Sequence, residues 1–575
     1  MSVPAALPST EFQFPAWNNL YQIRDFVRNV QELSAACDGR TWELERLDLN
    51  TWRSPREPCP NLEVRYAVYA DEESPFSSAL DVDHAFLNFA VLLFYLPRER
   101  GRSLRVRFLL PAGWKVATPL EEEEGELSAP DYDALVDSPA EAGHFQEYSY
   151  TQELEVSAPR AKTVPSGAGK KVAEYQVIVH ADPQDYPANR LLASLQKITA
   201  VETALMRDVP FSRYTFIFHF PRQGGGGGME HRNGTAISVS ASQVRSDWES
   251  VEAVAAHEFF HLWNVKRIRP QTLEPIDYVR GNDTRDLWFA EGVTSTFGEL
   301  ALLRAGLVTR GRFYARLAAE IRALENRPAR YFQSAELAGR EAWLEKYPDY
   351  HRPGRSISYY NKGALLGFLL DLAIRHASRN QSSLDDVMRR LNEDFARQGR
   401  FFALADLRAI IAQLAPSYTG LDAFLRDAVQ GTCDLDYDTA LGYAGLRLVR
   451  ETHSLLALEF SAVKNFDGTI QVTDVEPRGN AQQAGLAVGD ILLKMNGKSL
   501  YELPGFFLPA LRPGQKVKLQ VRRWGRTVGI EYALGTKQQT TCRLEELPNP
   551  SPEQLQVREG WLKGETTKAE VTASP

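Results

Sequence analysis

The sequence predicts a multidomain α+β protein with β-rich ends and a mostly helical centre. The chain has 575 residues, of which 43% are hydrophobic and 24% are charged. At roughly 100–200 residues per domain, this length suggests about three or four domains. Short β-type segments separated by turn residues fill about the first 170 residues and return between about 437 and 535. Helical apolar spacing dominates from about 246 to 430.

Charge and hydropathy exclude several classes of partner and location for this protein. The chain carries 66 Lys and Arg against 74 Asp and Glu, a net charge of −8, which argues against nucleic acid or an anionic membrane as a partner. The longest apolar runs, 85–96 and 363–370, are shorter than the ~20 residues of a spanning helix. The N-terminus shows no signal-peptide pattern, so we expect a cytoplasmic protein. Four scattered cysteines lack C-x-x-C spacing, which argues against a thiolate zinc site and against a disulfide-dense scaffold.

The first predicted domain, residues 1–170, is expected to be an N-terminal β-sandwich-like unit. Its strand-like segments are LEVRYAVYA (62–70), LRVRFLLP (104–111) and YTQELEVSA (150–158). They are rich in β-branched and aromatic residues, and clusters of Pro, Gly, Asp and Ser separate them. The Gly- and Lys-rich stretch 162–171 is predicted to be a linker or an exposed turn.

The second predicted domain covers residues 171–436. Two strand-like segments, 175–181 and 214–220, flank a stretch with helical apolar spacing at 189–206, and five glycines follow at 224–228. The rest is predicted to be mostly helical. The candidate helices are 247–264, 288–305, 310–326, 359–378, 384–397 and 405–415.

The third predicted domain, residues 437–536, is β-rich again, with segments such as KVKLQVRR and TVGIEYAL. The polar tail 537–575 is expected to be partly ordered at best. Within this tail, Leu555 and Trp561 are the residues that could dock on the body.

The strongest chemical motif is His257-Glu258-Phe259-Phe260-His261, which matches H-E-x-x-H. Residues four apart share one face of a helix, so both imidazoles can reach one ion. Glu258 can then turn toward a water at the metal and act as a general base. Ser246 followed by Glu249 is a possible capping box for this helix.

A catalytic zinc site needs a third protein ligand and one position left for water. The candidate is Glu291, thirty residues after His261 in the apolar stretch LWFAEGVTSTF. A lone carboxylate there would be costly to bury, and metal ligation would remove that cost. A salt-bridged core glutamate is the alternative interpretation.

The stretches HEFFHLWNVKRIRP and RDLWFAEGVTS resemble the M61 family of zinc peptidases, the glycyl aminopeptidases. The resemblance runs nearly the full length, since VRYAVYA and DHAFLNFAVLLFYL are similar to the family's N-terminal β domain. It implies a thermolysin-like (gluzincin) catalytic domain with one Zn²⁺ per chain, held by His257, His261 and Glu291. The interval between His261 and Glu291 is longer than in the related M1 aminopeptidases, so the third ligand of this chain cannot be located from the M1 interval.

Two further motifs carry site residues by resemblance. Gly228-Met229-Glu230-His231 resembles the exopeptidase motif whose glutamate binds the substrate's free α-amine, so Glu230 is implied as the amine anchor, with Gly228 and Met229 beside the substrate. A mobile glycine loop with an exposed glutamate is the alternative. Tyr360-Asn361-Lys362-Gly363 resembles Y-x-K-G, which implies that the Tyr360 hydroxyl stabilises the oxyanion. Tyr359 is an adjacent competitor that the Lys-Gly spacing disfavours.

The stretch GNAQQAGLAVGD (479–490) with ILLKMNGK resembles a PDZ domain of the bacterial protease-associated type. Such domains bind a C-terminal peptide at a sheet edge, with its carboxylate on a loop, here expected at Gly445 and Leu446. A PDZ-like domain that only packs on the body is the alternative.

These features predict a zinc aminopeptidase that removes small N-terminal residues, glycine and then alanine, from peptides. Glu258 would act as the general base, and the family resemblance alone implies the preference for small residues. Two alternatives remain at this stage. One is a zinc endopeptidase whose PDZ domain recruits protein substrates, and the other is a non-catalytic peptide-binding scaffold.

Overall fold

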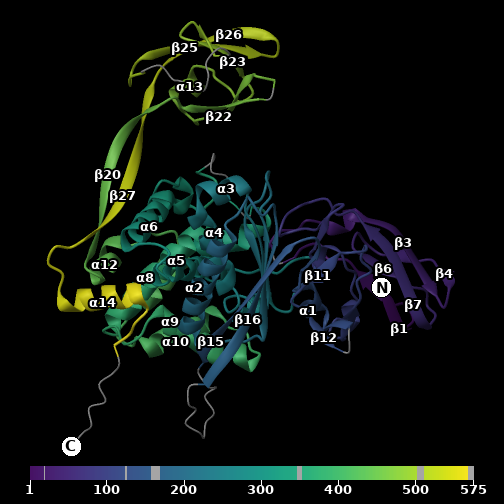
Figure 1. Ribbon diagram of the computed structural model, residues 1–575. Coiled ribbons are helices and arrows are strands. Elements are labelled where there is room, and N and C mark those ends of the chain that lie inside the picture. The colour runs from purple at the N-terminus through teal and green to yellow at the C-terminus, as the bar shows by residue number, and fades with distance from the viewer. Residues whose placement is uncertain are drawn as a thin grey trace, which may run out of the picture.

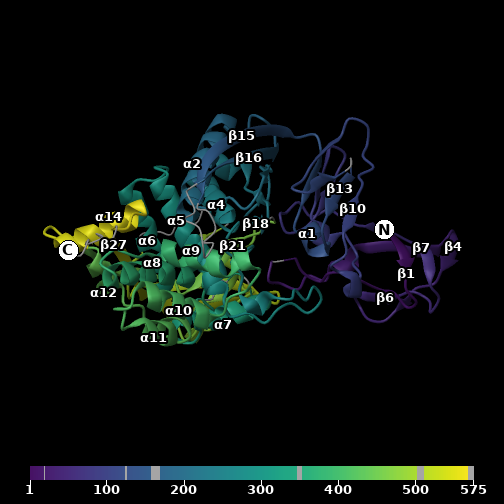
Figure 2. The same cartoon turned by 90° about the horizontal axis from the view of Figure 1, so that it is seen from below.

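The computed structural model describes residues 1–18, 20–123, 126–156, 169–345, 347, 353–465, 467–500 and 511–567. Figure 1 shows a β-rich N-terminal region beside a large body with a central sheet and many helices, and a small β module held away from that body. The view from below in Figure 2 shows the same N-terminal region at one side of the body. The predicted multidomain α+β fold is therefore confirmed.

Small antiparallel sheets build the N-terminal region. Their strand orders are β1-β7-β3-β4, β2-β6-β5, β11-β14-β9-β8 and β10-β13-β12. The strands are β1 (Ser2–Ala6), β2 (Glu11–Gln13), β3 (Val30–Cys37), β4 (Arg40–Trp42), β5 (Glu45–Arg46), β6 (Thr51–Arg53), β7 (Cys59–Val68), β8 (Ala79–Leu80), β9 (His84–Leu87), β10 (Leu104–Val106), β11 (Lys115–Ala117), β12 (Glu121–Glu123), β13 (Glu126–Ala129) and β14 (Ala140–Gly143). Of the three predicted segments, 62–70 falls mostly on β7, 104–111 is a strand only at β10 (Leu104–Val106), and the described part of 150–158 falls on β15 (Gln146–Val156). The linker predicted at 162–171 lies mostly outside the described residues.

Cys37 and Cys59 form a disulfide between neighbouring strands β3 and β7. The Cα atoms are 5.8 Å apart, which is within the usual range for a disulfide. No spacing motif predicted a bond between these two cysteines, which lie 22 residues apart. Because disulfides persist mainly in oxidising compartments, the bond counts against the cytoplasmic expectation.

The central sheet has the strand order β15-β16-β17-β19-β18, with β16 (Gly169–His180), β17 (Arg213–His219), β18 (Gly228–His231) and β19 (Gly234–Ser238). Alternate residues face opposite sides. Val177, Phe216 and Ile237 pack with α2 (Ala188–Met206) and α4 (Trp248–Phe260) in the main core. Ile178 and Ile217 face the other way and meet Phe86 and Ala117 of the N-terminal region, in a separate small core that joins the two domains.

The helical prediction for the body is close to the structure. The helices are α4, α5 (Thr294–Arg304), α6 (Arg310–Glu325), α8 (Tyr359–Ala377), α9 (Leu384–Asp394) and α10 (Leu404–Leu414). One expectation about the start of α4 is wrong. Ser246 ends the preceding helix α3 (Ala241–Ser246), and Asp247 is the N-cap residue of α4 without a side-chain hydrogen bond to the backbone. Glu249 forms no capping box, and its carboxylate pairs with Arg312 at 2.7 Å.

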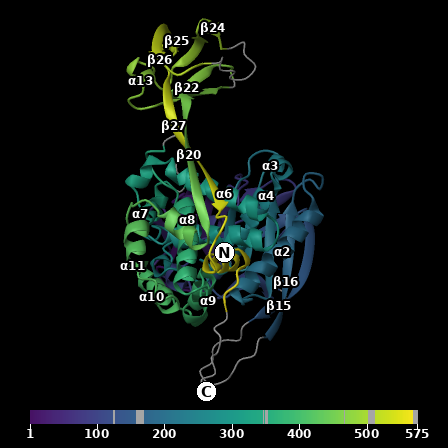
Figure 3. The same cartoon turned by 90° about the vertical axis from the view of Figure 1, so that its left-hand side faces the viewer.

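The C-terminal β module stands on a long two-stranded ribbon, as Figure 3 shows from the side. The ribbon consists of β20 (Leu446–Ala457) and β27 (Gly535–Glu546), paired antiparallel over their full length. The module itself is a sheet in the order β21-β22-β23-β25-β26, with its own core that includes Val472, Leu492 and Val521. Its inner and far strands are β22 (Ile470–Val475), β23 (Ile491–Met495), β25 (Lys516–Arg523) and β26 (Arg526–Ala533). The outer strand β21 spans Phe460–Lys464.

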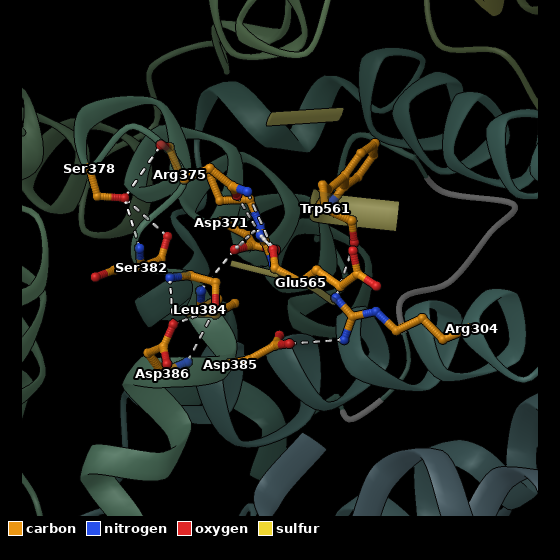
Figure 4. A network of polar contacts seen from close by, with 12 residues as sticks. Arg304, Asp371, Arg375, Ser378, Ser382, Leu384, Asp385, Asp386, Trp561 and Glu565 are labelled. Carbon is orange, nitrogen blue, oxygen red and sulfur yellow. Dashed lines mark hydrogen bonds and ion pairs between the residues drawn. The ribbon is translucent and has the colours of Figure 1, made fainter. Parts of the chain in front are cut away.

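The segment 537–575 was expected to be partly ordered at best, but its described part, 537–567, belongs to the fold. Strand β27 runs on to Glu546, and α14 (Pro552–Lys563) packs on the helical body. Trp561 is fully buried, as its docking required, whereas Leu555 is 40% exposed. Figure 4 shows the polar contacts that hold this helix: Arg304 donates to the carbonyl of Trp561 at 3.1 Å, and Arg375 donates to the carbonyl of Glu565 at 2.8 Å.

Within the described part of the chain, no helix is long and apolar enough to cross a membrane.

Candidate functional site

Helix α4 carries the two histidines of the H-E-x-x-H motif. His257 lies in its last turn, and His261 is its C-cap residue. The four-residue spacing brings the two Nε2 atoms to 3.0 Å from each other, with the ring planes nearly perpendicular. Both imidazole edges therefore meet at one point, as the motif predicted.

Glu291 meets the histidines from a neighbouring element. One of its carboxylate oxygens lies 3.4 Å from Nε2 of His257 and 3.2 Å from Nε2 of His261. Glu291 sits in the π-helical turn Trp288–Val293 that precedes α5, and such turns are frequent at functional sites. His257, His261 and Glu291, here called the HExxH cluster, offer three ligand atoms within 4.8 Å of one another.

Hydrogen bonds to the far ring nitrogens fix the orientation of both imidazoles. Nδ1 of His261 lies 2.6 Å from the backbone carbonyl of Asn264, so Nδ1–H donates and Nε2 keeps its lone pair for the cluster. Nδ1 of His257 lies 3.2 Å from the Ser295 hydroxyl. The Asn264 side chain also donates to the carbonyl of Phe289 at 2.8 Å, which ties the end of α4 to the turn that carries Glu291. The motif alone revealed none of these partners.

The electrostatics of the cluster favour a cation. Burial opposes ionisation of Glu291, but His261 and His257 hold its pKa well below the usual range. Burial lowers the pKa of His257, whereas for His261 the effect of burial is outweighed by Glu291, Glu230 and Glu258, which raise its pKa to about 9. Three carboxylates thus surround two imidazoles in a buried space, and the donor set fits zinc with one position left open.

Glu258 points to the same space from the turn between the two histidines. Its carboxylate lies within 4.8 Å of ligand atoms of Glu230 and His261. Gly228 allows this approach, because a Cβ at that position would lie 2.5 Å from the Glu258 carboxyl carbon. Gly228 was expected to lie beside the substrate, and the structure adds that it makes room for Glu258.

Glu230 and Met229 lie on β18, at the edge of the central sheet next to the cluster. Glu230 is 7% exposed, and its Oε1 has no hydrogen-bond partner among the described residues. The alternative interpretation, in which Glu230 is an exposed glutamate on a glycine loop, is therefore wrong. The Met229 sulfur accepts hydrogen bonds from Asn88 at 3.3 Å and more weakly from Asn18 at 4.0 Å, so the N-terminal region supports this strand.

Tyr360 reaches the cluster from the first turn of α8. Its ring lies 6.0 Å from the His257 ring and lines the cleft, whereas Tyr359 is buried behind it with the ring centroids 4.7 Å apart. Burial raises the pKa of the Tyr360 hydroxyl well above its usual value, which keeps it protonated and able to donate. Gly363 lets α8 approach Gly292 of the π-helical turn, where a Cβ would lie 2.8 Å from the Gly292 Cα.

A cleft of about 390 Å³ opens beside the cluster, and all the predicted active-site residues line it. Residues that the sequence did not single out line it as well. Phe76 and Leu20 come from the N-terminal region, and Tyr347 stacks on Tyr360 with ring centroids 6.1 Å apart. The walls thus come from two domains, which no motif within one segment could reveal.

The predicted carboxylate loop at Gly445 and Leu446 is wrong. Leu446 begins the ribbon strand β20, and the Gly445 carbonyl accepts a hydrogen bond from Leu547 at 2.8 Å. A Cβ at Gly445 would lie 2.8 Å from Pro550, so this turn packs against the segment leading to α14. The turn therefore supports the base of the ribbon and lies away from the edges of the module sheet, which begins at β21.

Three family models match separate parts of the chain. The peptidase M61 N-terminal domain matches residues 1–144, the M61 glycyl aminopeptidase matches residues 250–366, and a PDZ domain matches residues 471–523. The second of these stretches contains the whole HExxH cluster together with Glu258 and Tyr360. No curated protein sequence matches the chain.

Solved structures show a related fold. An aminopeptidase N family protein from Idiomarina loihiensis aligns over 98% of this chain and 96% of its own, with a TM-score of 0.83 and 23% identity. An M1 zinc metallopeptidase from Deinococcus radiodurans aligns over 74% and 88%, with a TM-score of 0.44 and 15% identity. Native yeast LTA4 hydrolase aligns over 76% and 65%, with a TM-score of 0.44 and 12% identity. Of these three, the first is similar enough to show a shared fold.

Proposed function

We propose that this chain, a peptidase, is a zinc-dependent aminopeptidase. The premise is its domain composition, which joins the N-terminal and peptidase domains of the M61 family to a PDZ domain. The chain would release small N-terminal residues, glycine and then alanine, from peptides. The observation that carries the proposal is the buried Glu230 carboxylate beside Glu258 and His261. Its Oε1 has no partner among the described residues, and a substrate ammonium would satisfy it.

The HExxH cluster fits zinc in ligand type and in geometry. Two imidazoles and one carboxylate are a known catalytic ligand set, and the cleft beside them leaves room for water and substrate. When bound there, zinc would polarise the scissile carbonyl and promote ionisation of water. The hydrogen bonds to Asn264 and Ser295 would hold the imidazoles in the orientation that this ligation requires.

The remaining steps belong to the protein's own side chains. Glu258 would take a proton from the attacking water and pass it to the leaving amine. The Tyr360 hydroxyl would donate a hydrogen bond to the oxyanion of the tetrahedral intermediate. Glu230 would hold the substrate's free α-amine, which sets the distance from the N-terminus to the bond that is cut.

An additional proposal concerns the PDZ module. Its outer strand β21 presents one edge of the sheet, and an extended C-terminal peptide could add there as a further strand. Tethering a substrate in this way would raise its local concentration near the cleft without new contacts at the active site.

Hydrolysis of paired p-nitroanilides tests the main proposal. Gly-, Ala- and Leu-p-nitroanilide are compared with their N-acetylated forms, each with and without a chelator. We expect turnover in the order Gly, Ala, Leu, loss of turnover with chelator, and little cleavage of acetylated substrates. Equal cleavage of free and acetylated substrates would favour an endopeptidase, and no cleavage by a zinc-loaded chain would favour a scaffold.

A further inference from the structure

A second cluster of metal-binding side chains lies between the N-terminal region and the catalytic body. His84 begins β9, Glu141 lies in the adjacent strand β14, and His180 ends β16 of the central sheet. The two domains meet here beside the small core around Phe86 and Ile178. We call His84, Glu141 and His180 the interdomain cluster.

The geometry of this cluster is close to that of a metal site. One ligand atom from each of the three residues lies within 4.8 Å of the others. The rings of His84 and His180 are stacked with their centroids 3.7 Å apart and their planes only 8° apart, so one ring has to tilt before both nitrogens can bind one ion. Nε2 of His84 lies 3.9 Å from Oε1 of Glu141, which is too long for a hydrogen bond. Ligands of a tetrahedral zinc with ~2.0–2.1 Å bonds lie about 3.3 Å apart. Binding would therefore shorten the distance between His84 and Glu141 by about half an ångström and tilt one imidazole out of the stack.

Two atoms that face each other in this cluster lack any other role. Nε2 of His84 and Oε1 of Glu141 are buried and have no hydrogen-bond partner among the described residues. His84 is 2% exposed and Glu141 is fully buried. Burying such atoms unpaired is costly, because each loses its hydrogen bonds to water. A cation between them would satisfy both.

Neighbouring groups already orient the donors for ligation. Nδ1 of His84 lies 3.2 Å from the Asp81 carboxylate, so Nδ1–H donates there and leaves the Nε2 lone pair for the cluster. Nδ1 of His180 lies 3.3 Å from the carbonyl of His144, which likewise frees its Nε2. His219 donates to Oε2 of Glu141 at 2.9 Å and leaves Oε1 facing His84. This carboxylate–histidine arrangement is typical of metal sites in proteins.

The backbone is also shaped for close approach at this point. Gly143 pairs with His84 across β14 and β9 and has a φ of +123°. A Cβ there would lie 2.4 Å from the carbonyl oxygen of Asp83 and 2.6 Å from the His84 Cα. A residue with a side chain would therefore push β9 away from β14 and separate His84 from Glu141.

We propose that the interdomain cluster binds a second divalent transition metal, such as Zn²⁺, which clamps the N-terminal region to the catalytic body. Imidazole and carboxylate donors suit this class of ion. The site lies between β9 and β14 of the N-terminal region and β16 of the central sheet, and none of its three residues lines the cleft, so its role is structural and it takes no part in peptide hydrolysis. The chain would then hold about two metal ions where the HExxH cluster alone accounts for one.

Cobalt titration of the full chain tests this proposal, with Co²⁺ as the probe because its visible spectrum reports imidazole and carboxylate ligation. The double variant His257→Ala, His261→Ala removes the HExxH cluster. After metal is stripped, this chain should still bind about one Co²⁺, and adding His180→Ala, which removes a ligand, should weaken that binding by more than the ~10- to 100-fold that loss of a supporting hydrogen-bond partner costs. His180 is half-buried at a strand end, so its truncation should leave the fold intact by circular dichroism.

The wild-type background and a matched histidine provide the controls. Wild-type chain should bind about two Co²⁺ and the single His180→Ala variant about one, with a smaller rise in Tm on metal addition. His453→Ala removes an exposed histidine on β20 and should leave the stoichiometry at two. A folded double variant that binds no Co²⁺, or one whose binding is unchanged by His180→Ala, would overturn the proposal. Either result leaves the aminopeptidase assignment untouched, because hydrolysis is measured separately.

Discussion

The HExxH cluster and the interdomain cluster use the same donor set, two imidazoles and one carboxylate, in different surroundings. In the first, the nitrogen and oxygen atoms lie 3.0–3.4 Å apart, and Glu230, Glu258 and Tyr360 lie beside them in the cleft. In the second, His84 and Glu141 lie 3.9 Å apart between two packed sheets. The comparison indicates that the ligand atoms decide whether a metal binds. Whether the bound metal can hydrolyse a peptide depends on access for substrate and water and on nearby acid–base side chains.

The largest expected effect is on turnover at the HExxH cluster alone. Glu258→Gln keeps the shape of the side chain but removes the general base, so kcat should fall about 10³-fold while the metal content stays the same. Steady-state kinetics on Gly-p-nitroanilide and metal analysis on the same sample give both values. Substantial residual turnover, or loss of metal, would show that Glu258 has another role.

The loss of turnover should be smaller when the Glu258 carboxylate is displaced than when it is replaced. Gly228→Ala puts a Cβ 2.5 Å from the Glu258 carboxyl carbon, so the carboxylate has to move. Misplacement of a catalytic group by about 1 Å can cost about 10²-fold in rate, and we expect a loss of that size with metal retained. Gly311→Ala is the matched control, because a Cβ there meets nothing within 4 Å. Equal kinetics for the two variants would contradict the close packing of Gly228 on Glu258.

Removal of the proposed amine anchor should affect specificity more than chemistry. Glu230→Ala should lower kcat/KM for free-amine substrates about 10- to 100-fold, the value of one or two charge-assisted hydrogen bonds. Acetylated substrates have no ammonium to lose, so their slow cleavage should change little. The ratio of the two kcat/KM values is the measurement, and an equal loss for both would defeat the anchor role.

The smallest effects compare the supporting groups of the two clusters directly. Ser295→Ala removes the group at Nδ1 of His257, and Asp81→Asn weakens the group at Nδ1 of His84. Each should lower metal affinity about 10-fold, but only at its own cluster. Competition with a chromophoric chelator measures both sites. If Ser295→Ala weakened both sites equally, the two clusters could not be treated as independent.

The sequence predicted the HExxH cluster because its chemistry follows from local spacing. His257 and His261 share a helix face, and a lone carboxylate at Glu291 in an apolar stretch needed a partner. The supporting groups could not be predicted in the same way. One is a backbone carbonyl at Asn264, and the other is Ser295, which is placed by packing between two elements.

The interdomain cluster was missed because its members belong to three segments that meet only in the fold. The sequence did carry a weak signal: His180 and His219 each end an apolar strand, in YQVIVHA and YTFIFHF. These strands run parallel and place the two histidines opposite each other. Similarly, the Cys37–Cys59 bond depends on the pairing of β3 with β7, and the carboxylate loop at Gly445 failed because the turn packs on the α14 segment.

Zinc back-titration of the metal-free chain tests the central claim most directly. Turnover of Gly-p-nitroanilide is measured as zinc is added stepwise to a chain stripped by chelation. The HExxH cluster has its donors already within 3.4 Å and needs less rearrangement than the interdomain cluster, so it should fill first. Activity should therefore start near zero and reach its plateau at about one zinc per chain. Full activity in the stripped chain, or a zinc-loaded chain without activity, would contradict the account.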